Sequence, residues 1–181
     1  MIARLMILLP LLMFVFASSA FADTTDDAAK IADLTKRLYQ AVTFEKGQHP
    51  PLDSIRTMFL KNGQIINNTG PKPAIFTVNS FISAAKKQFK TGLEAVKKQP
   101  EKKATLAFSE KEIAAKTDIF GQIAQRFSTY SASFTPDDPN SYAKGINSIQ
   151  FVKVNGEWKV ASLIWNDETP TLKIPAEYLS N

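Results

Sequence analysis

Two runs near the end of the chain, residues 145–154 and 157–165, carry the pattern of hydrophobic and polar positions expected of strands. Asn155-Gly156 separates them, and this dipeptide favours a type I′ hairpin turn because both central residues of that turn need positive φ. Successive strand residues point to opposite faces, so the return strand is predicted to be apolar on both. One face would carry Trp158, Val160 and Ile164, and the other Ala161, Leu163 and Trp165. Such a strand is expected to be covered on both sides.

Apolar residues recur at three- and four-residue spacing in the first half of the chain, which predicts helices. The predicted helices cover residues 28–42, 52–59 and 77–90. Asp53 or Ser54 is expected to cap the second helix, and Asn79 or Ser80 the third. Residues 92–103 are rich in lysine and contain Pro100, so they fit either an extension of the third helix or an exposed connection.

The remaining segments predict strands, turns and a tail. In chain order they are a frayed acidic lead-in (23–27), a turn at Asn62-Gly63, a short strand (64–67), a loop (68–73), a strand (104–116), the longest strand (119–134), a turn-rich loop (135–140) and a packing tail (174–179). Helices that precede a run of antiparallel strands indicate an α+β fold of one domain, in which the sheet packs against the helices.

The first 22 residues resemble a secretory signal peptide. Arg4 provides the basic start, residues 5–16 are apolar, and Ala20-Phe21-Ala22 has the small-x-small pattern of a cleavage site. An uncleaved N-terminal anchor is the alternative, although the apolar run is shorter than the roughly 20 residues that span a bilayer. We therefore expect a mature domain of residues 23–181, located in the periplasm or secreted.

The composition narrows the possible chemistry. The chain has no cysteine and one histidine, so disulfides, thiolate catalysis and a multi-histidine metal site are excluded, and no metal or cofactor is expected. The full chain carries a formal charge of +5, and removal of Arg4 with the signal leaves 21 bases and 17 acids, or +4. A charge this small does not favour nucleic acid as a partner.

The segment Ile119-Phe120-Gly121-Gln122-Ile123-Ala124-Gln125-Arg126-Phe127-Ser128-Thr129-Tyr130 and the hairpin at 145–165 resemble the central strands of uncharacterised bacterial proteins of the nuclear transport factor 2-like superfamily. This superfamily shares its cystatin-like, cone-shaped α+β fold with ketosteroid isomerase, scytalone dehydratase and SnoaL-like polyketide cyclases. The resemblance implies N-terminal helices in the concave face of a strongly bent antiparallel sheet. It also implies a pocket at the open end of the cone and a homodimer formed through the other face of the sheet.

Several side chains are candidates for binding a ligand in such a pocket. Arg126 would share a strand face with Gln122 and Tyr130 and could clamp a carboxylate, unless it pairs with an acid such as Glu112. Tyr39 lies where the resemblance implies a phenol that donates to an oxyanion. The other candidates on the pocket wall are Asn67 and Trp165. Together with Trp158, Phe120 and Tyr130, Trp165 could form an apolar cage or simply belong to the core.

Candidates for acid–base chemistry are fewer. His49, the only histidine, lies beside two prolines in a loop and is expected to be solvated. The acids nearest the predicted sheet are Asp118, Glu112, Asp167 and Glu168, of which Asp167 could lie at the rim of the cone. The lysine-rich run 86–103 could meet an anionic partner but fits a solvated face. Asn67-Asn68-Thr69 matches a glycosylation sequon, which matters only in a eukaryotic secretory pathway.

These observations leave three functions open. The first is an exported protein that binds a small, partly apolar or anionic molecule in its cone. The second is an isomerase, dehydratase or cyclase that works by acid–base catalysis in the same cavity, and the third is a module that binds another protein. The lack of an obvious acid–base set favours binding over catalysis.

Overall fold

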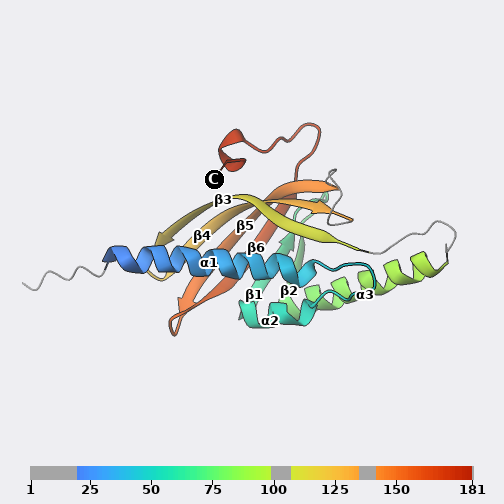
Figure 1. The fold of residues 1–181 in the computed structure, drawn as a ribbon, viewed down its shortest axis with the longest axis horizontal. Helices are drawn as coiled ribbons and strands as arrows, with labels where there is room; N and C mark the ends of the chain where they lie inside the picture. The colour runs from blue at the N-terminus through green and yellow to red at the C-terminus, as the bar shows by residue number, and fades with distance from the viewer. Residues whose placement is uncertain (1–19, 99–106, 135–141, 181) are drawn as a thin grey trace, which may run out of the picture.

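The computed structural model describes residues 20–98, 107–134 and 142–180, and its elements follow the α+β order predicted from the sequence (Figure 1). The helical elements are α1 (Ala20–Val42), η1 (Leu52–Ser54), α2 (Ile55–Met58), α3 (Val78–Lys97) and η3 (Ala176–Tyr178). The strands are β1 (Phe59–Asn67), β2 (Ala74–Thr77), β3 (Ser109–Phe120), β4 (Ile123–Ser133), β5 (Ala143–Val154) and β6 (Glu157–Asp167). The predicted loop at 135–140 lies outside the described residues.

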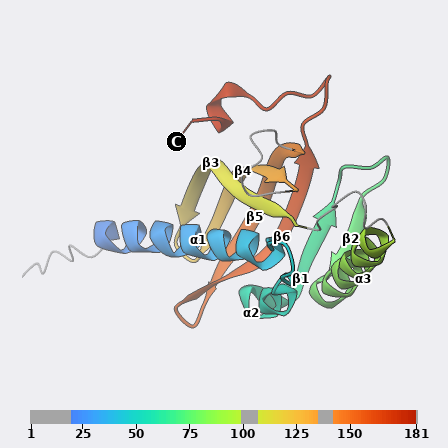
Figure 2. The same cartoon turned by 45° about the vertical axis from the view of Figure 1, so that its right-hand side comes forward.

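The six strands form one sheet in the order β2-β1-β6-β5-β4-β3. The sheet is mixed rather than purely antiparallel, because β1 runs parallel to β6 while the other neighbours are antiparallel. It bends around the helices, with α1 across its concave face and α2 and α3 beside β1 and β2 (Figure 2). Within the described residues, no helix combines the length and apolar character needed to cross a membrane.

The core lies between α1 and the middle of the sheet. Helix α1 presents one apolar stripe at three- and four-residue spacing, as its sequence predicts. Buried residues of this core include Ile31, Leu34, Leu38, Phe151 and Val160. The C-terminal segment covers part of the opposite face, where Tyr178 packs against Phe127 and its carbonyl accepts a hydrogen bond from Thr129. The predicted packing tail is therefore confirmed.

The predicted hairpin is confirmed, but the predicted division of its return strand into two apolar faces is wrong. Asn155 and Gly156 have φ of 51° and 82°, as a type I′ turn requires. In β6, however, Ala161 is an extra residue, because Val160 pairs with Phe151 while Ser162 pairs with Gln150. This β-bulge reverses the alternation. Trp158, Val160, Leu163 and Trp165 therefore all contribute to the core on the concave face, and Ile164 is left exposed on the other.

One strand prediction and one turn prediction are also wrong. The segment predicted as one strand at 119–134 is a hairpin, in which Gly121, with φ of 58°, and Gln122 connect β3 to β4. Asn62-Gly63 does not form a turn but lies within β1, where the register against β6 shifts. A Cβ on Gly63 would lie 2.8 Å from Cδ1 of Phe59, so this position needs glycine for close packing.

The ends of the helices differ from the predictions in detail. The last residue of β2, Thr77, falls within the predicted third helix. The observed helix begins at Val78 and extends as far as Lys97. Its cap is Thr77, whose hydroxyl accepts from the Ser80 backbone, rather than Asn79 or Ser80. Neither Asp53 nor Ser54 caps the second helical segment; the Asp53 carboxylate pairs with Arg56 and Lys86 instead.

The acidic segment 23–27, predicted to be a frayed lead-in, is part of α1. Asp27 is only 4% exposed, and its carboxylate accepts hydrogen bonds from Nε1 of Trp158 and Nζ of Lys153, both at 2.9 Å. Burial alone would raise the pKa of Asp27, but these hydrogen bonds and the Lys153 charge outweigh it and hold the pKa below its ordinary value. The start of α1 is thus fastened to the β5–β6 hairpin.

We predict that Asp27→Ala lowers the free energy of unfolding by about 2–4 kcal/mol, because it removes the buried acceptor shared by Trp158 and Lys153. Asp26→Ala is the matched control, since Asp26 is exposed and pairs with Lys30 along the helix, and it should cost less than about 0.5 kcal/mol. Urea unfolding measures both. Equal effects of the two substitutions would contradict the buried anchor.

The contacts of Asp27 also make the stability of the fold depend on pH. A carboxyl whose pKa is lowered on folding stabilises the fold above its ordinary pKa of 3.8 and loses that contribution as the pH falls through the lower folded value. The difference in stability between wild type and Asp27→Ala should therefore shrink below about pH 4.

Candidate functional site

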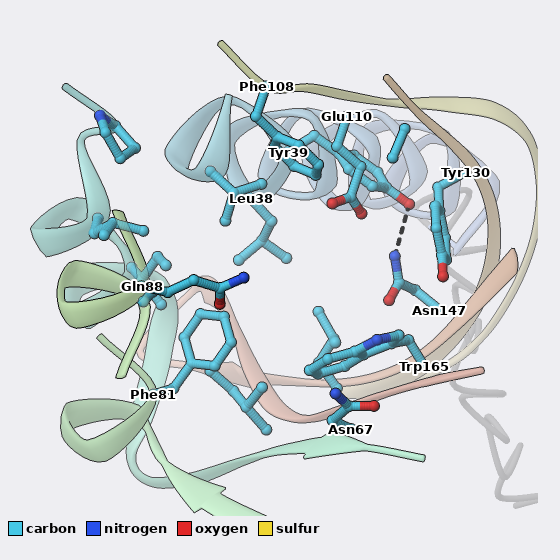
Figure 3. A pocket seen from close by; sticks show the side chains of 18 of the residues that line it. Leu38, Tyr39, Asn67, Phe81, Gln88, Phe108, Glu110, Tyr130, Asn147 and Trp165 are labelled. Carbon is cyan, nitrogen blue, oxygen red and sulfur yellow. Dashed lines mark hydrogen bonds between the residues drawn. The ribbon is translucent and has the colours of Figure 1, made fainter. Parts of the chain in front are cut away.

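A cavity of about 500 Å³ lies between the C-terminal half of α1, helix α3 and the concave face of the sheet (Figure 3). Its wall is mainly apolar. Helix α3 and β2 provide Phe76, Phe81 and Phe89, and β6 provides Leu163 and Trp165. The bulge in β6 places these last two side chains on the cavity side of the sheet. The size falls within the range of about 300–1,000 Å³ that is typical of small-molecule pockets.

Five of the polar side chains that line the cavity gather at one end, whereas the amides of Gln88 and Asn67 lie elsewhere on its wall (Figure 3). Tyr39 comes from α1, Glu110 from β3, Tyr130 from β4 and Asn147 from β5, and in Figure 3 they point toward one another. Asp167, at the end of β6, completes the group and accepts a hydrogen bond from the Tyr130 hydroxyl. The bend of the sheet brings together residues from β3 and β6, which are separated in the sheet by two other strands.

The Tyr130 ring has room because its neighbour on β5 is Gly145. The two residues are paired in the sheet, and a Cβ on Gly145 would lie 2.5 Å from the Tyr130 hydroxyl oxygen. Real Cβ atoms do not come that close to another atom, so any side chain at Gly145 would displace the ring. Glycine at this position therefore helps to shape the polar end of the cavity.

The phenol of Tyr39 belongs to a hydrogen-bonded chain with a defined direction. It accepts from Nδ2 of Asn147 at 3.0 Å and lies 2.6 Å from Oγ of Ser128. The Ser128 hydroxyl donates to Glu112, so the proton between Tyr39 and Ser128 must come from the phenol. Because the phenol proton is already donated to Ser128, Tyr39 is a poor donor for an oxyanion in the cavity.

Burial changes the protonation of the three main ionisable groups. It raises the pKa of Glu110 to about 7; the negative charge of Asp167 adds to this rise and the hydrogen bond with Asn147 opposes it. Glu110 is partly exposed as a residue, but its carboxyl group points into the cavity (Figure 3). Burial also raises the pKa of both Tyr39 and Tyr130 above the usual range, so both phenols stay neutral.

Comparison with known proteins supports the fold and gives no activity. No family model matches the sequence, and neither does any curated protein. Solved structures do match. One is a protein from Novosphingobium aromaticivorans described as nuclear transport factor 2-like with a cystatin-like fold, at 12% identity and a TM-score of 0.63, with 92% of this chain and 96% of that chain covered. The chain has the nuclear transport factor 2-like fold.

Two further matches agree with this nuclear transport factor 2-like assignment. A cystatin-like protein of unknown function from Nostoc punctiforme matches with a TM-score of 0.58 at 15% identity, over 81% of this chain and 93% of that one. A nuclear transport factor 2-like protein of unknown function from Silicibacter pomeroyi matches with a TM-score of 0.53 at 12% identity, over 80% and 98%. The predicted fold is confirmed, and at these identities the likeness extends to the fold alone.

Within this nuclear transport factor 2-like domain, four of the six predicted ligand-binding residues line the cavity: Tyr39, Asn67, Tyr130 and Trp165. Arg126 and Gln122 do not. Arg126 shares the concave face with Tyr130, as predicted, but four residues along a strand span about 13 Å, which takes it beyond the cavity. Its guanidinium pairs with Glu112, the alternative that the sequence offered, and Gln122 lies in the exposed β3–β4 turn.

The other candidates are mostly structural or exposed. His49 is exposed and contacts Phe89, with ring centroids 4.9 Å apart and ring planes tilted by 59°. Asp118 is exposed and accepts from Gln125, and Glu168 pairs with Lys173. The proposed aromatic cage does not form. Phe120 is 84% exposed and Trp158 is held by Asp27, while Trp165 and Tyr130 line the cavity.

Sequence analysis missed two residues of the polar end, Glu110 and Asn147. Glu110 lies near the start of β3, two positions after Phe108, so it falls on the same strand face as that apolar residue. An acid at a position where alternation predicts an apolar residue was the available sequence signal. Asn147 occupies an inward position of β5 between Gly145 and Ile149. Within the described residues, no group of three His, Asp or Glu side chains lies close enough to hold a metal ion.

We predict that Glu110 titrates near pH 7, which carbon NMR of the labelled carboxyl can measure directly. A carboxyl whose pKa is raised on folding stabilises the fold below its ordinary value of 4.5 and loses that contribution as the pH rises through the folded value of about 7. Glu110→Gln should therefore unfold like wild type near pH 4 but be up to about 3 kcal/mol more stable above pH 8. An NMR midpoint near 4.5 would contradict the buried carboxyl.

Proposed function

We propose that the chain is a binding protein that holds a small, partly apolar molecule in the cavity between α1, α3 and the sheet. One observation carries this proposal: a cavity of about 500 Å³ has a mainly apolar wall, and most of its polar groups lie at one end. Binding pockets have this arrangement, in which apolar area supplies affinity and a few polar groups fix orientation.

The shape of the cavity also separates this proposal from a module that only binds protein. Such a module would have its cone filled by its own side chains. Here residues such as Phe81, Gln88 and Trp165 surround open space in place of filling it (Figure 3). The cavity therefore favours a small ligand over a purely structural use of the cone.

Acid–base catalysis is the second candidate, and Glu110 favours it. A general base or acid works best when its pKa lies near the working pH, and burial raises the pKa of Glu110 to about 7. Against the oxyanion mechanism suggested by the family resemblance, the Tyr39 proton is donated to Ser128. If the chain is an enzyme, Glu110→Gln should stop turnover of the co-purified molecule while its binding, measured by native mass spectrometry, persists.

Export is part of the same proposal. Cleavage after Ala22 would remove the signal and the first three residues of α1 but leave Asp27, whose contacts fasten that helix. The mature chain would thus keep its anchor. Intact-mass measurement of the protein from its host should give a chain that begins at Asp23, and a full-length mass in the cell would oppose export.

A homodimer through the outer sheet face is likewise a proposal. The expectation came from the family resemblance, and the bulge removes the two-sided strand that agreed with it. Three isoleucines still lie side by side on that face: Ile75 pairs with Ile66, and Ile66 with Ile164. Ile75 is 65% exposed and Ile164 is 38% exposed. If this face forms the dimer, Ile164→Lys should convert it to a monomer in light scattering.

We predict that Ala84→Phe blocks the cavity. Ala84 lies on the exposed side of α3 and lines the cavity, so a phenyl ring there would occupy its mouth without disturbing the core. Binding of the neutral dye N-phenylnaphthylamine, followed by fluorescence, should weaken by about tenfold or more. Ser83→Phe is the control, because Ser83 is equally exposed on α3 and does not line the cavity. Equal dye binding by both variants would contradict the proposed site.

A further inference from the structure

The charged groups that line the cavity are all acidic. Among the lining residues in the described part of the chain, Glu110 and Asp167 are the ionisable acids, and none is lysine, arginine or histidine. The two carboxyl groups are close enough for the charge of Asp167 to affect the proton affinity of Glu110. Arg126, which lies beyond the cavity on the concave face, has an acidic partner elsewhere, since its guanidinium pairs with Glu112.

The directions of the hydrogen bonds add to the effect of this excess of acidic groups. Both phenol protons at the polar end are already donated, that of Tyr39 to Ser128 and that of Tyr130 to Asp167. Carboxylates accept hydrogen bonds and do not donate them when ionised. When Glu110 is ionised, its carboxylate and that of Asp167 therefore offer acceptors to a ligand group that supplies hydrogen-bond donors.

Aromatic rings lie near the same position. In Figure 3, Tyr39 and Tyr130 lie beside Glu110, and Trp165 lies across the cavity next to Phe81, with ring centroids 6.4 Å apart. Phe76 and Phe89 also line the cavity. Aromatic faces attract cations, most strongly where water is excluded. A carboxylate in such surroundings pays a desolvation cost that an anionic ligand would increase and a cationic one would relieve.

We infer that the ligand is a small apolar amine, whose protonated nitrogen lies against Glu110 and Asp167 and whose hydrocarbon body extends toward Phe76, Phe81 and Phe89. This inference rests on the proposed function and replaces the anionic ligand expected from Arg126. The nitrogen supplies hydrogen-bond donors to the two carboxylates and the positive charge that the polar end lacks. The phenylalanine wall accommodates the rest of the molecule.

The inference predicts that amine binding depends on pH. The groups that face Glu110 are Tyr39 from α1, Tyr130 from β4, Asn147 from β5 and Asp167 from β6. A bound ammonium favours the ionised carboxylate, so binding near neutral pH displaces the proton that Glu110 carries when its pKa is about 7. Amine affinity should therefore rise about tenfold between pH 6 and pH 8, a range in which alkylamines stay protonated.

The test compares three probes of the same shape, phenylbutylamine, phenylbutanol and phenylbutanoate, by calorimetry on the mature full chain at pH 8. We expect the amine to bind about tenfold more tightly than the alcohol, and the carboxylate to bind most weakly. Glu110→Gln should remove the amine preference while alcohol binding changes less than about twofold, which also shows that the variant is folded. Asp118→Asn, an exposed acid on the same strand, should keep the preference.

The outcomes separate this inference from the proposed function. Alcohol binding without an amine preference, or with a preference for the carboxylate, would overturn the amine inference and leave the binding pocket in place. An amine preference that survives Glu110→Gln and shows no rise between pH 6 and pH 8 would also overturn it. Failure of all three probes at millimolar concentration would overturn both.

Discussion

One extra residue in β6, Ala161, determines how the concave face of the sheet is used. Without the bulge, Trp158 and Val160 would face away from Leu163 and Trp165. With it, the first pair packs under α1 and the second pair forms the wall of the cavity. Bulges also strengthen the local bend of a strand, and this sheet has to bend for β3 and β6 to contribute to the same polar end. Core and cavity thus depend on the same irregularity.

The polar end is joined to a second buried network. Asn147 connects the cavity to Tyr39, and the chain continues through Ser128 to Glu112 and Arg126. Side-chain polar atoms buried in the described residues all have hydrogen-bond partners. A network that is fully satisfied restricts the orientation of each member, which fixes the Tyr39 ring before any ligand arrives. Arg126 therefore acts on the cavity indirectly, through the groups it positions, although it does not line it.

Sequence reasoning could establish the fold because periodicity and turn chemistry are local. The helical spacing of Ile31, Leu34 and Leu38 and the Asn155-Gly156 turn do not depend on distant residues. The site was harder to predict, because alternation assigns a face but not a position along it. Arg126 and Tyr130 share a face, yet only Tyr130 reaches the cavity. Glu110 was missed because its place beside Asp167 arises from the bend of the sheet. Bulges at Ala161 and Ile113 also reverse the face on which the following residues lie, and they have no clear sequence signal.

The order in which the chain can fold follows from the contacts that fasten α1. Asp27 and Trp158 lie 131 positions apart, and the parallel pairing of β1 with β6 also waits for the last strand. Closing such long loops slows folding, because the entropy is lost before the contacts form. The contacts that hold α1 against the β5–β6 hairpin therefore cannot form until the last strands have been synthesised. Under the export proposed above, the contacts that fasten α1 would form only after the C-terminal hairpin had crossed the membrane.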